Sequence, residues 1–206
     1  MSLFTKKDEY DVFWNWFNKR EESIFNHLEE DTNAIALEIS TNLKKIHNDL
    51  AFEISFEIIN GKRNFVLSAD GVVDQFPIII ELANRAPIYN RWNIIPFRPR
   101  LDQHNQVIEM EDIKLDYNDI FFQYVEDDKL DLIHLDVFVL GYDGQDNRYV
   151  HIYFILLDSL VGEYDAVTKI GDTIMYPLPE ESDLVLHEFK DLIGILDGLD
   201  KTDKIN

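Results

Sequence analysis

The sequence predicts an α+β fold, in which a mostly antiparallel sheet is packed by an N-terminal helix pair and a C-terminal helix. Apolar residues recur at helical spacing in the first 47 residues, alternate at strand spacing over much of 50–157, and return to helical spacing near the C-terminus. No repeat, low-complexity tract or linker interrupts this order. A single domain over residues 1–206 therefore fits best.

Two amphipathic helices are expected first, over residues 8–29 and 31–47. Their apolar stripes recur every three or four residues: Tyr10, Phe13, Trp14, Phe17, Ile24, Phe25 and Leu28 in the first, and Ile35, Ile39, Leu43 and Ile46 in the second. Asp8 lies in the first turn of one helix, and Asp31 or Thr32 can cap the other. The short turn between them predicts an antiparallel pair.

Strands follow. Residues 50–59 alternate apolar with polar and are joined by Asn60-Gly61 to a returning strand at 64–68, because both turn residues tolerate positive φ. A short helix is expected over 76–86, and prolines place 92–97 at a sheet edge or at a strand end. The remaining segments expected to be extended are 107–110, 113–115, 119–125, 132–140, 149–157 and 173–176, with 158–167 helical and a last helix over 184–199.

The charge restricts the partners. The chain has 40 acidic and 19 basic residues, for a net charge of −21. Nucleic acid and anionic membrane surfaces are poor partners for such a chain, because both are bound through positive patches. A basic protein would be attracted, although excess acid also serves solubility alone. The oligomeric state is left open.

Cysteine is absent, which excludes disulfides, thiolate metal sites and cysteine nucleophiles. The first residues contain no apolar stretch of signal-peptide length, and the longest apolar runs, such as Ile152–Leu157, are strand-sized. A cytoplasmic location is expected. No cofactor or metal is expected either, since the chain lacks a Walker loop, a dinucleotide glycine pattern and a calcium-loop spacing.

The first candidate site lies on the predicted hairpin of 132–140 and 149–157. If Leu140 pairs with Tyr149, one sheet face carries His134, Asp136, His151 and Tyr153. Such a set can bind a metal or move protons near neutral pH. The alternative is a half-exposed sheet face on which these residue types are ordinary.

Two further candidates come from local spacing. In WNIIPFRPR, Trp92 precedes Arg98 and Arg100, whose guanidinium groups can reach one carboxylate or phosphate together, or pair instead with the acidic surface. In LDSLVGEYD, Asp158 and Glu163 can act as acid and base if burial separates their pKa values. Acids at the start of a helix explain the same pattern.

Four segments together resemble a family of uncharacterised bacterial proteins of about this length. They are FWNWF at 13–17, LSADG at 67–71, the run ending in PFRPR at 86–100, and LLDSLVGEYD at 156–165. The resemblance implies a bacterial cytoplasmic protein and carries no catalytic residue over. Some small acidic proteins of this kind act as immunity or partner-binding proteins.

Two hypotheses follow. The chain is a protein-interaction module, immunity-like and binding a basic partner. Alternatively, it is a small-ligand or metal-dependent enzyme that uses the His/Asp/Tyr face or the Arg98/Arg100 pair. The charge and the missing motifs favour the first, and no enzyme class is predicted.

Overall fold

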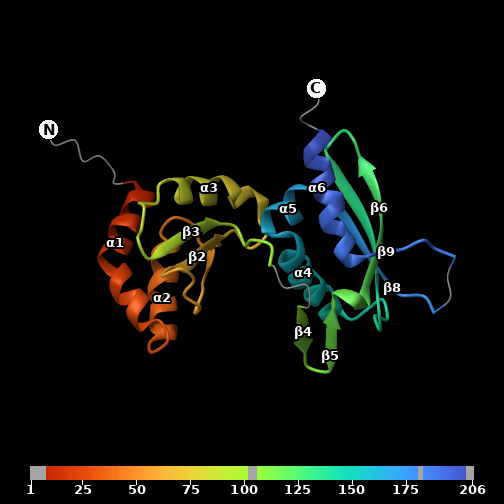
Figure 1. The fold of residues 1–206 in the computed structure, drawn as a ribbon, viewed down its shortest axis with the longest axis horizontal. Coiled ribbons are helices and arrows are strands. Elements are labelled where there is room, and N and C mark those ends of the chain that lie inside the picture. Colours follow the sequence, from red (N-terminus) through yellow and green to blue (C-terminus); the bar gives the residue numbers. More distant parts are fainter. Residues whose placement is uncertain (1–7, 102–105, 181–182, 203–206) are drawn as a thin grey trace. The chain divides into compact units, whose positions relative to one another are not determined.

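The computed structural model describes residues 8–101, 106–180 and 183–202. It is α+β, with mixed and antiparallel sheets, an N-terminal helix pair and a C-terminal helix, which confirms the predicted fold class. The chain divides into two compact units, Met1–Arg98 (unit 1) and Pro99–Asn206 (unit 2). Each unit is described by itself (Figure 1). The expectation of one domain stays a prediction.

Unit 1 begins with α1 (Glu9–His27) and α2 (Thr32–Leu43). The Asp8 carboxylate caps α1 by accepting a hydrogen bond from the Tyr10 amide. The apolar stripe of α1 then faces the sheet, where Phe17 packs 5.1 Å from Phe65 and 5.5 Å from Trp92 between ring centroids. The aromatic density near the N-terminus is therefore core, because these rings bury large apolar areas against one another.

The unit 1 sheet has the order β1-β2-β3. The antiparallel pair β1 and β2 is joined across Asn60 and Gly61, both at positive φ as the hairpin signal predicts, and β3 runs parallel to β2 at the edge. Strand β1 is shorter than expected, since the regular ladder ends at Ile54 and only the Ser55 amide and an isolated Ile59–Lys62 bridge continue the pairing. Phe56, Ile58 and Ile59 are exposed. The bounds are β1 Ala51–Ile54, β2 Arg63–Ser68, η1 Val73–Gln75, α3 Phe76–Asn84 and β3 Trp92–Pro96.

A buried arginine holds the chain where it leaves strand β1. Arg63 is 3% exposed and donates to the carbonyl oxygens of Ser55 and Phe56 and, at 2.6 Å, to the Glu29 carboxylate. A buried charge needs such partners, because desolvation of an unpaired one is costly. The guanidinium therefore ties residues 55–56 to the end of α1 instead of letting the strand continue.

Unit 2 begins with a two-stranded hairpin and continues with a four-stranded sheet of order β8-β7-β6-β9. Strands β6 and β7 are antiparallel, β9 is antiparallel to β6, and β8 is parallel to β7. The bounds are β4 Val107–Met110, β5 Ile113–Asp116, η2 Tyr117–Asp119, β6 Ile120–Asp127, β7 Leu132–Val139, α4 Asn147–Val161, α5 Glu163–Thr168, β8 Ile170–Pro177, β9 His187–Glu188, η3 Phe189–Asp191 and α6 Leu192–Thr202.

The expected hairpin of 132–140 and 149–157 is wrong in its second arm. Residues 149–157 lie inside α4, whose N-terminus is capped by the Asp146 side chain accepting from the Arg148 amide. A parallel strand needs a crossover, and α4 with α5 supplies it between β7 and β8. The last helix also begins later than expected, at Leu192, because β9 and η3 precede it.

The core of unit 2 lies between one face of the four-stranded sheet and the two helices α4 and α6. Figure 1 shows both helices on the same side of the strands. Strand β7 alternates as predicted, with Ile133, Leu135, Val137 and Val139 buried. They meet the helix residues Ile152, Leu156, Leu160, Leu192 and Leu196. Within the described residues, the helices of unit 2 cover only this face of the sheet.

Candidate functional site

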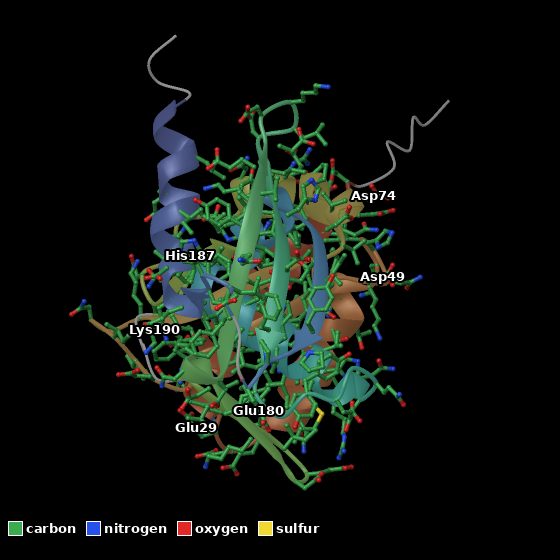
Figure 2. The ribbon with its side chains drawn as sticks, turned by 90° about the vertical axis from the view of Figure 1, so that its right-hand side faces the viewer. Glu29, Asp49, Asp74, Glu180, His187 and Lys190 are labelled. Carbon is green, nitrogen blue, oxygen red and sulfur yellow. The ribbon has the colours of Figure 1, made fainter. Side chains whose placement is uncertain are left out.

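The other face of this sheet is the candidate site, and we call it the open face. Strand register places its residues together, since Gln123 lies opposite Asp136, Val125 opposite His134, and Asp136 in turn opposite Ile174. Cross-strand partners on one face have side chains in contact range. Figure 2 is turned so that the strands of unit 2 face the viewer. The open face consists of Phe121, Gln123, Val125, Asp127, Leu132, His134, Asp136, Phe138, Asp172, Ile174, Tyr176 and Glu188.

The open face combines negative charge with exposed apolar side chains. None of the residues in β6, β7, β8 or β9 is lysine or arginine, whereas the face carries the carboxylates of Asp127, Asp136, Asp172 and Glu188. Between them, Val125 is 69% and Ile174 is 53% exposed. Large apolar side chains in this position remain hydrated, and burying them against a partner is favourable.

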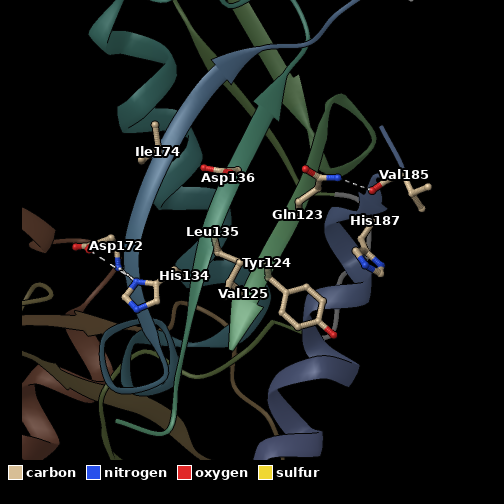
Figure 3. A pocket seen from close by; sticks show the side chains of 10 residues that line it. All are labelled: Gln123, Tyr124, Val125, His134, Leu135, Asp136, Asp172, Ile174, Val185 and His187. Carbon is tan, nitrogen blue, oxygen red and sulfur yellow. Dashed lines mark hydrogen bonds and ion pairs between the residues drawn. The ribbon is translucent and has the colours of Figure 1, made fainter. Parts of the chain in front are cut away.

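His134 stands at the centre of this charge. Its Nδ1 accepts a hydrogen bond of 3.0 Å from the Asp172 amide, so the neutral ring carries its proton on Nε2 (Figure 3). Nε2 lies 3.9 Å from an Asp127 carboxylate oxygen, and Nδ1 lies 3.8 Å from one of Asp172. The ring also packs over Gly171, where a Cβ would come within 2.8 Å of Cε1. Gly171 therefore makes room for the ring.

A hollow of about 600 Å³ opens at this part of the face. Its lining comes from all four strands and from the segment before β9, whose Val185 carbonyl accepts a hydrogen bond of 3.1 Å from the Gln123 amide group. The lining residues are Gln123, Tyr124, Val125, His134, Leu135, Asp136, Asp172, Ile174, Val185 and His187 (Figure 3). His134 and His187 lie on opposite sides of the view, so the hollow does not bring the two rings together.

Two of the four side chains expected on one sheet face do lie on the open face, and two do not. His134 and Asp136 are there, on β7. His151 and Tyr153 belong to α4, which packs against the opposite face of the sheet. The predicted His/Asp/Tyr cluster is therefore not formed, because its second half is a helix. Among the described residues, no group of three or more His, Asp or Glu side chains is placed to hold a metal ion.

Tyr153 is instead a core residue. Its side chain is 0% exposed, and its ring packs against that of Phe189 with 5.8 Å between the ring centroids. Thr173 lies close enough to the hydroxyl to favour its ionised form slightly. The two groups are not in hydrogen-bonding geometry, however, so the Tyr153 oxygen has no hydrogen-bond partner within the described residues. Burial raises the pKa of this phenol above its ordinary value, because the phenolate is poorly solvated in the core.

Each arginine of the predicted pair forms ion pairs with carboxylates of its own unit. Arg98, in unit 1, pairs with Glu53 and, at 2.9 Å, with Asp70. Arg100, in unit 2, donates to the Val161 carbonyl and pairs with carboxylates of α5 and α6, those of Asp165 and Asp197. The structure thus contains the alternative arrangement, in which these arginines pair with carboxylates of the acidic surface. Their joint capture of a ligand stays a prediction.

The remaining candidates lie in packed surroundings. Trp92 is 2% exposed and donates its indole N–H to Glu21 at 2.9 Å. Asp158 is half-buried on α4, and Glu163 is fully buried at the first position of α5. Gly162, at φ +83°, separates the two helices, so the two acids lie in different helices and not in the single helix that was expected. Their catalytic pairing stays a prediction.

A second hollow of about 420 Å³ lies between the β6–β7 turn and α6. Its rim carries the carboxylates of Glu126, Asp127, Asp128 and Asp131, and its helix side is formed partly by Gly194 and Gly198. The acidic run Glu126-Asp127-Asp128 thus lies next to the open face. It extends the negative charge of unit 2 around the end of the sheet.

Asp172, Ile174 and Tyr176 are site residues that the sequence pattern did not predict. The segment 173–176 was expected to be extended, but nothing local indicates that it pairs with β7, since β7 and β8 are separated by two helices. The alternation of Asp172, Ile174 and Tyr176 with Thr173 and Met175 is the one signal that the sequence offered.

Comparison of the chain with protein-family models, with curated proteins and with solved structures finds no match. No helix in the described ranges has both the length and the apolar character needed to cross a membrane.

Proposed function

We propose that the chain is a protein-interaction module that binds a basic protein partner through the open face of unit 2. The observation that supports this most is the distribution of charge. Unit 2 holds 25 acidic and 8 basic residues, a net −17, while unit 1 holds 15 and 11, a net −4. The negative charge is thus concentrated in the unit whose sheet face is free of lysine and arginine.

Three basic residues of unit 2, Arg100, Arg148 and Lys169, form ion pairs with carboxylates that lie outside the four strands. Arg148 pairs with Glu111, Asp112 and Asp146, away from the four strands, and Lys169 pairs with Asp165 at 3.0 Å. The face carboxylates therefore keep an outward negative field, which accelerates encounter with a cationic surface. Exposed Val125, Ile174 and Tyr176 then supply the apolar area that holds a partner after encounter.

The test uses matched charge changes in the two units. The double variant Asp136→Asn/Asp172→Asn removes two charges from the open face, and Glu30→Gln/Asp74→Asn removes two exposed charges from unit 1. We expect wild type and the unit 1 variant to retain a basic protein at about 50 mM salt and release it at about 500 mM, because added salt screens exposed charges. The open-face variant should bind the purified partner about tenfold more weakly by calorimetry.

Neutralisation of a basic toxin is the instance that we propose, and inhibition of the captured partner's activity by the full chain would support it. The proposal is wrong if no basic protein is retained at low salt. It is equally wrong if the three proteins bind the partner alike.

A small cationic ligand in the hollow around His134 is the second candidate. The hollow of about 600 Å³ is of the size that holds small molecules, and Asp136 and Asp172 line it. Metal and small-molecule analysis of the purified protein discriminates between the two functions. A bound cation or metal at one per chain that is lost on His134→Ala would favour this candidate.

A further inference from the structure

Strand β8 forms an open edge of the unit 2 sheet. Within the described residues it pairs with β7 on one side, and no strand pairs with it on the other. Edges of this kind carry unsatisfied main-chain donors and acceptors, and they accept an added strand from another chain. The direction in which the β8 amides point decides which residues can do so.

Two hydrogen bonds fix that direction. The Leu178 amide donates to the Val139 carbonyl at 3.1 Å, and the Asp172 amide donates to His134 Nδ1 at 3.0 Å, so both point toward β7. N–H and C=O groups alternate in direction along a strand, so Ile174 and Tyr176 also point toward β7. Thr173 and Met175 therefore direct their main-chain groups to the free edge.

The free edge is short and bounded at both ends. The register between β7 and β8 shifts between the pairs Ile133–Ile170 and Leu135–Thr173, which marks an irregularity at the start of the strand. Pro177 ends the strand and has no N–H to donate. Such irregularities and prolines commonly block the addition of a strand to a sheet edge. Between the irregularity and Pro177, residues 173–176 remain available for pairing with another strand.

We infer that this window is a strand-addition site, at which an extended segment of the basic partner pairs with the main chain of Thr173 and Met175. The inference rests on the proposed function and names how the partner is held. The added strand would continue the open face, so its outward side chains would lie beside Asp172, Ile174 and Tyr176. A lysine or arginine beside Asp172 and apolar residues beside Ile174 and Tyr176 match that surface.

Charge selects a foreign basic segment over a second copy of this chain. Pairing β8 with β8 of another copy would bring together two units that each carry a net charge of −17. Like charges at close range oppose such a contact, whereas a cationic segment is attracted by the same field. The occupant is therefore a positively charged extended segment of another protein.

The test uses the full chain and a short peptide in which valine alternates with threonine between terminal lysines. Its counterpart has the same charge and side chains but is N-methylated at each valine and threonine, so these residues cannot donate main-chain hydrogen bonds. At low salt we expect the first peptide to bind and to slow hydrogen exchange of the Thr173 and Met175 amides about tenfold. The methylated peptide should bind at least tenfold more weakly.

A pair of variants checks the edge from the protein side. Met175→Pro removes an N–H that points away from β7, whereas Met175→Ala keeps it and shortens the side chain. We expect the proline variant to lose about tenfold in affinity for the unmethylated peptide and the alanine variant to lose much less. If the proline variant does not fold, the comparison of the two peptides still tests the inference.

The outcomes separate this inference from the proposed function. Equal binding of the two peptides, no binding of either, or unchanged exchange at Thr173 and Met175 under saturating peptide overturns strand addition. Equal binding that still requires Asp136 and Asp172 overturns strand addition alone and leaves the open face as the binding surface. Binding that Asp136→Asn/Asp172→Asn does not weaken counts against the proposed function itself.

Discussion

The hydroxyl of Tyr153 is buried in the core of unit 2 beside Thr173, without a hydrogen-bond partner in the described residues. A buried donor left unpaired costs free energy, because it has given up water and gained nothing in return. Tyr153→Phe removes the hydroxyl and keeps the ring against Phe189. We expect its free energy of unfolding to be unchanged or about 1 kcal/mol higher than wild type by urea denaturation. A loss of more than about 1 kcal/mol would show that the hydroxyl is satisfied.

The ionisation of the same phenol should lower the free energy of unfolding at alkaline pH. Burial raises the pKa of Tyr153 in the folded state, while the unfolded chain ionises near the ordinary tyrosine pKa of about 10. The group therefore contributes stability below pH 10, which is lost as the pH rises above it, by up to about 1.4 kcal/mol per pH unit. Unfolding free energies measured from pH 9 to 11 should fall for wild type and fall less for Tyr153→Phe. Parallel pH profiles would contradict this assignment.

At the scale of elements, α4 shows why part of the fold was mispredicted. The run from Tyr149 to Leu157 is apolar or aromatic at nearly every position, so it fits a strand alternation as well as a helical stripe. Its helical signals lie outside the run, at the Asp146 cap and at Gly162. The amphipathic α1, α2 and α3 and the Asn60-Gly61 hairpin were predictable, because each has one clear periodicity or turn signal.

The glycines of unit 2 give a prediction at the same scale. Gly194 lies within α6 and a Cβ there would meet nothing within 4 Å, so Gly194→Ala should raise the free energy of unfolding by about 0.5–1 kcal/mol. Gly171→Ala places its Cβ against the His134 ring and should lower stability while breaking the bond from the Asp172 amide to Nδ1. Chemical denaturation measures both, and histidine ring NMR signals should move in the second variant only.

Opposite signs for these two identical substitutions are the informative result. If Gly194→Ala destabilises, the surface of α6 is covered by something that the described residues do not include. If Gly171→Ala leaves the ring signals of His134 unchanged, the ring does not pack over β8 as described.

For the whole molecule, the open face depends on a long-range pairing. His134 and Asp172 come together because β8 returns parallel to β7 after two helices, and no local spacing encodes that pairing. The sequence could predict that Ile133, Leu135, Val137 and Val139 are buried and that His134 and Asp136 face the other way. It could not predict the neighbours of His134, because strand order is a property of the assembled sheet.

The negative charge of unit 2 should make its stability more sensitive to salt than that of unit 1, and the aromatic residues of the chain allow the two units to be followed separately. All three tryptophans, Trp14, Trp16 and Trp92, lie in unit 1, whereas seven of the nine tyrosines lie in unit 2. Self-repulsion at a net −17 destabilises the compact state of unit 2, and salt screens that repulsion. Raising the salt from about 0.02 to 0.5 M should therefore shift the thermal midpoint seen by tyrosine circular dichroism upward by several degrees, and that seen by tryptophan fluorescence by less. Sodium chloride and potassium chloride should act alike, which controls for binding of a particular ion.

Equal shifts of the two thermal midpoints would mean that the units unfold together. No shift in either midpoint would mean that the carboxylates of unit 2 are too well spaced or too well paired to repel one another.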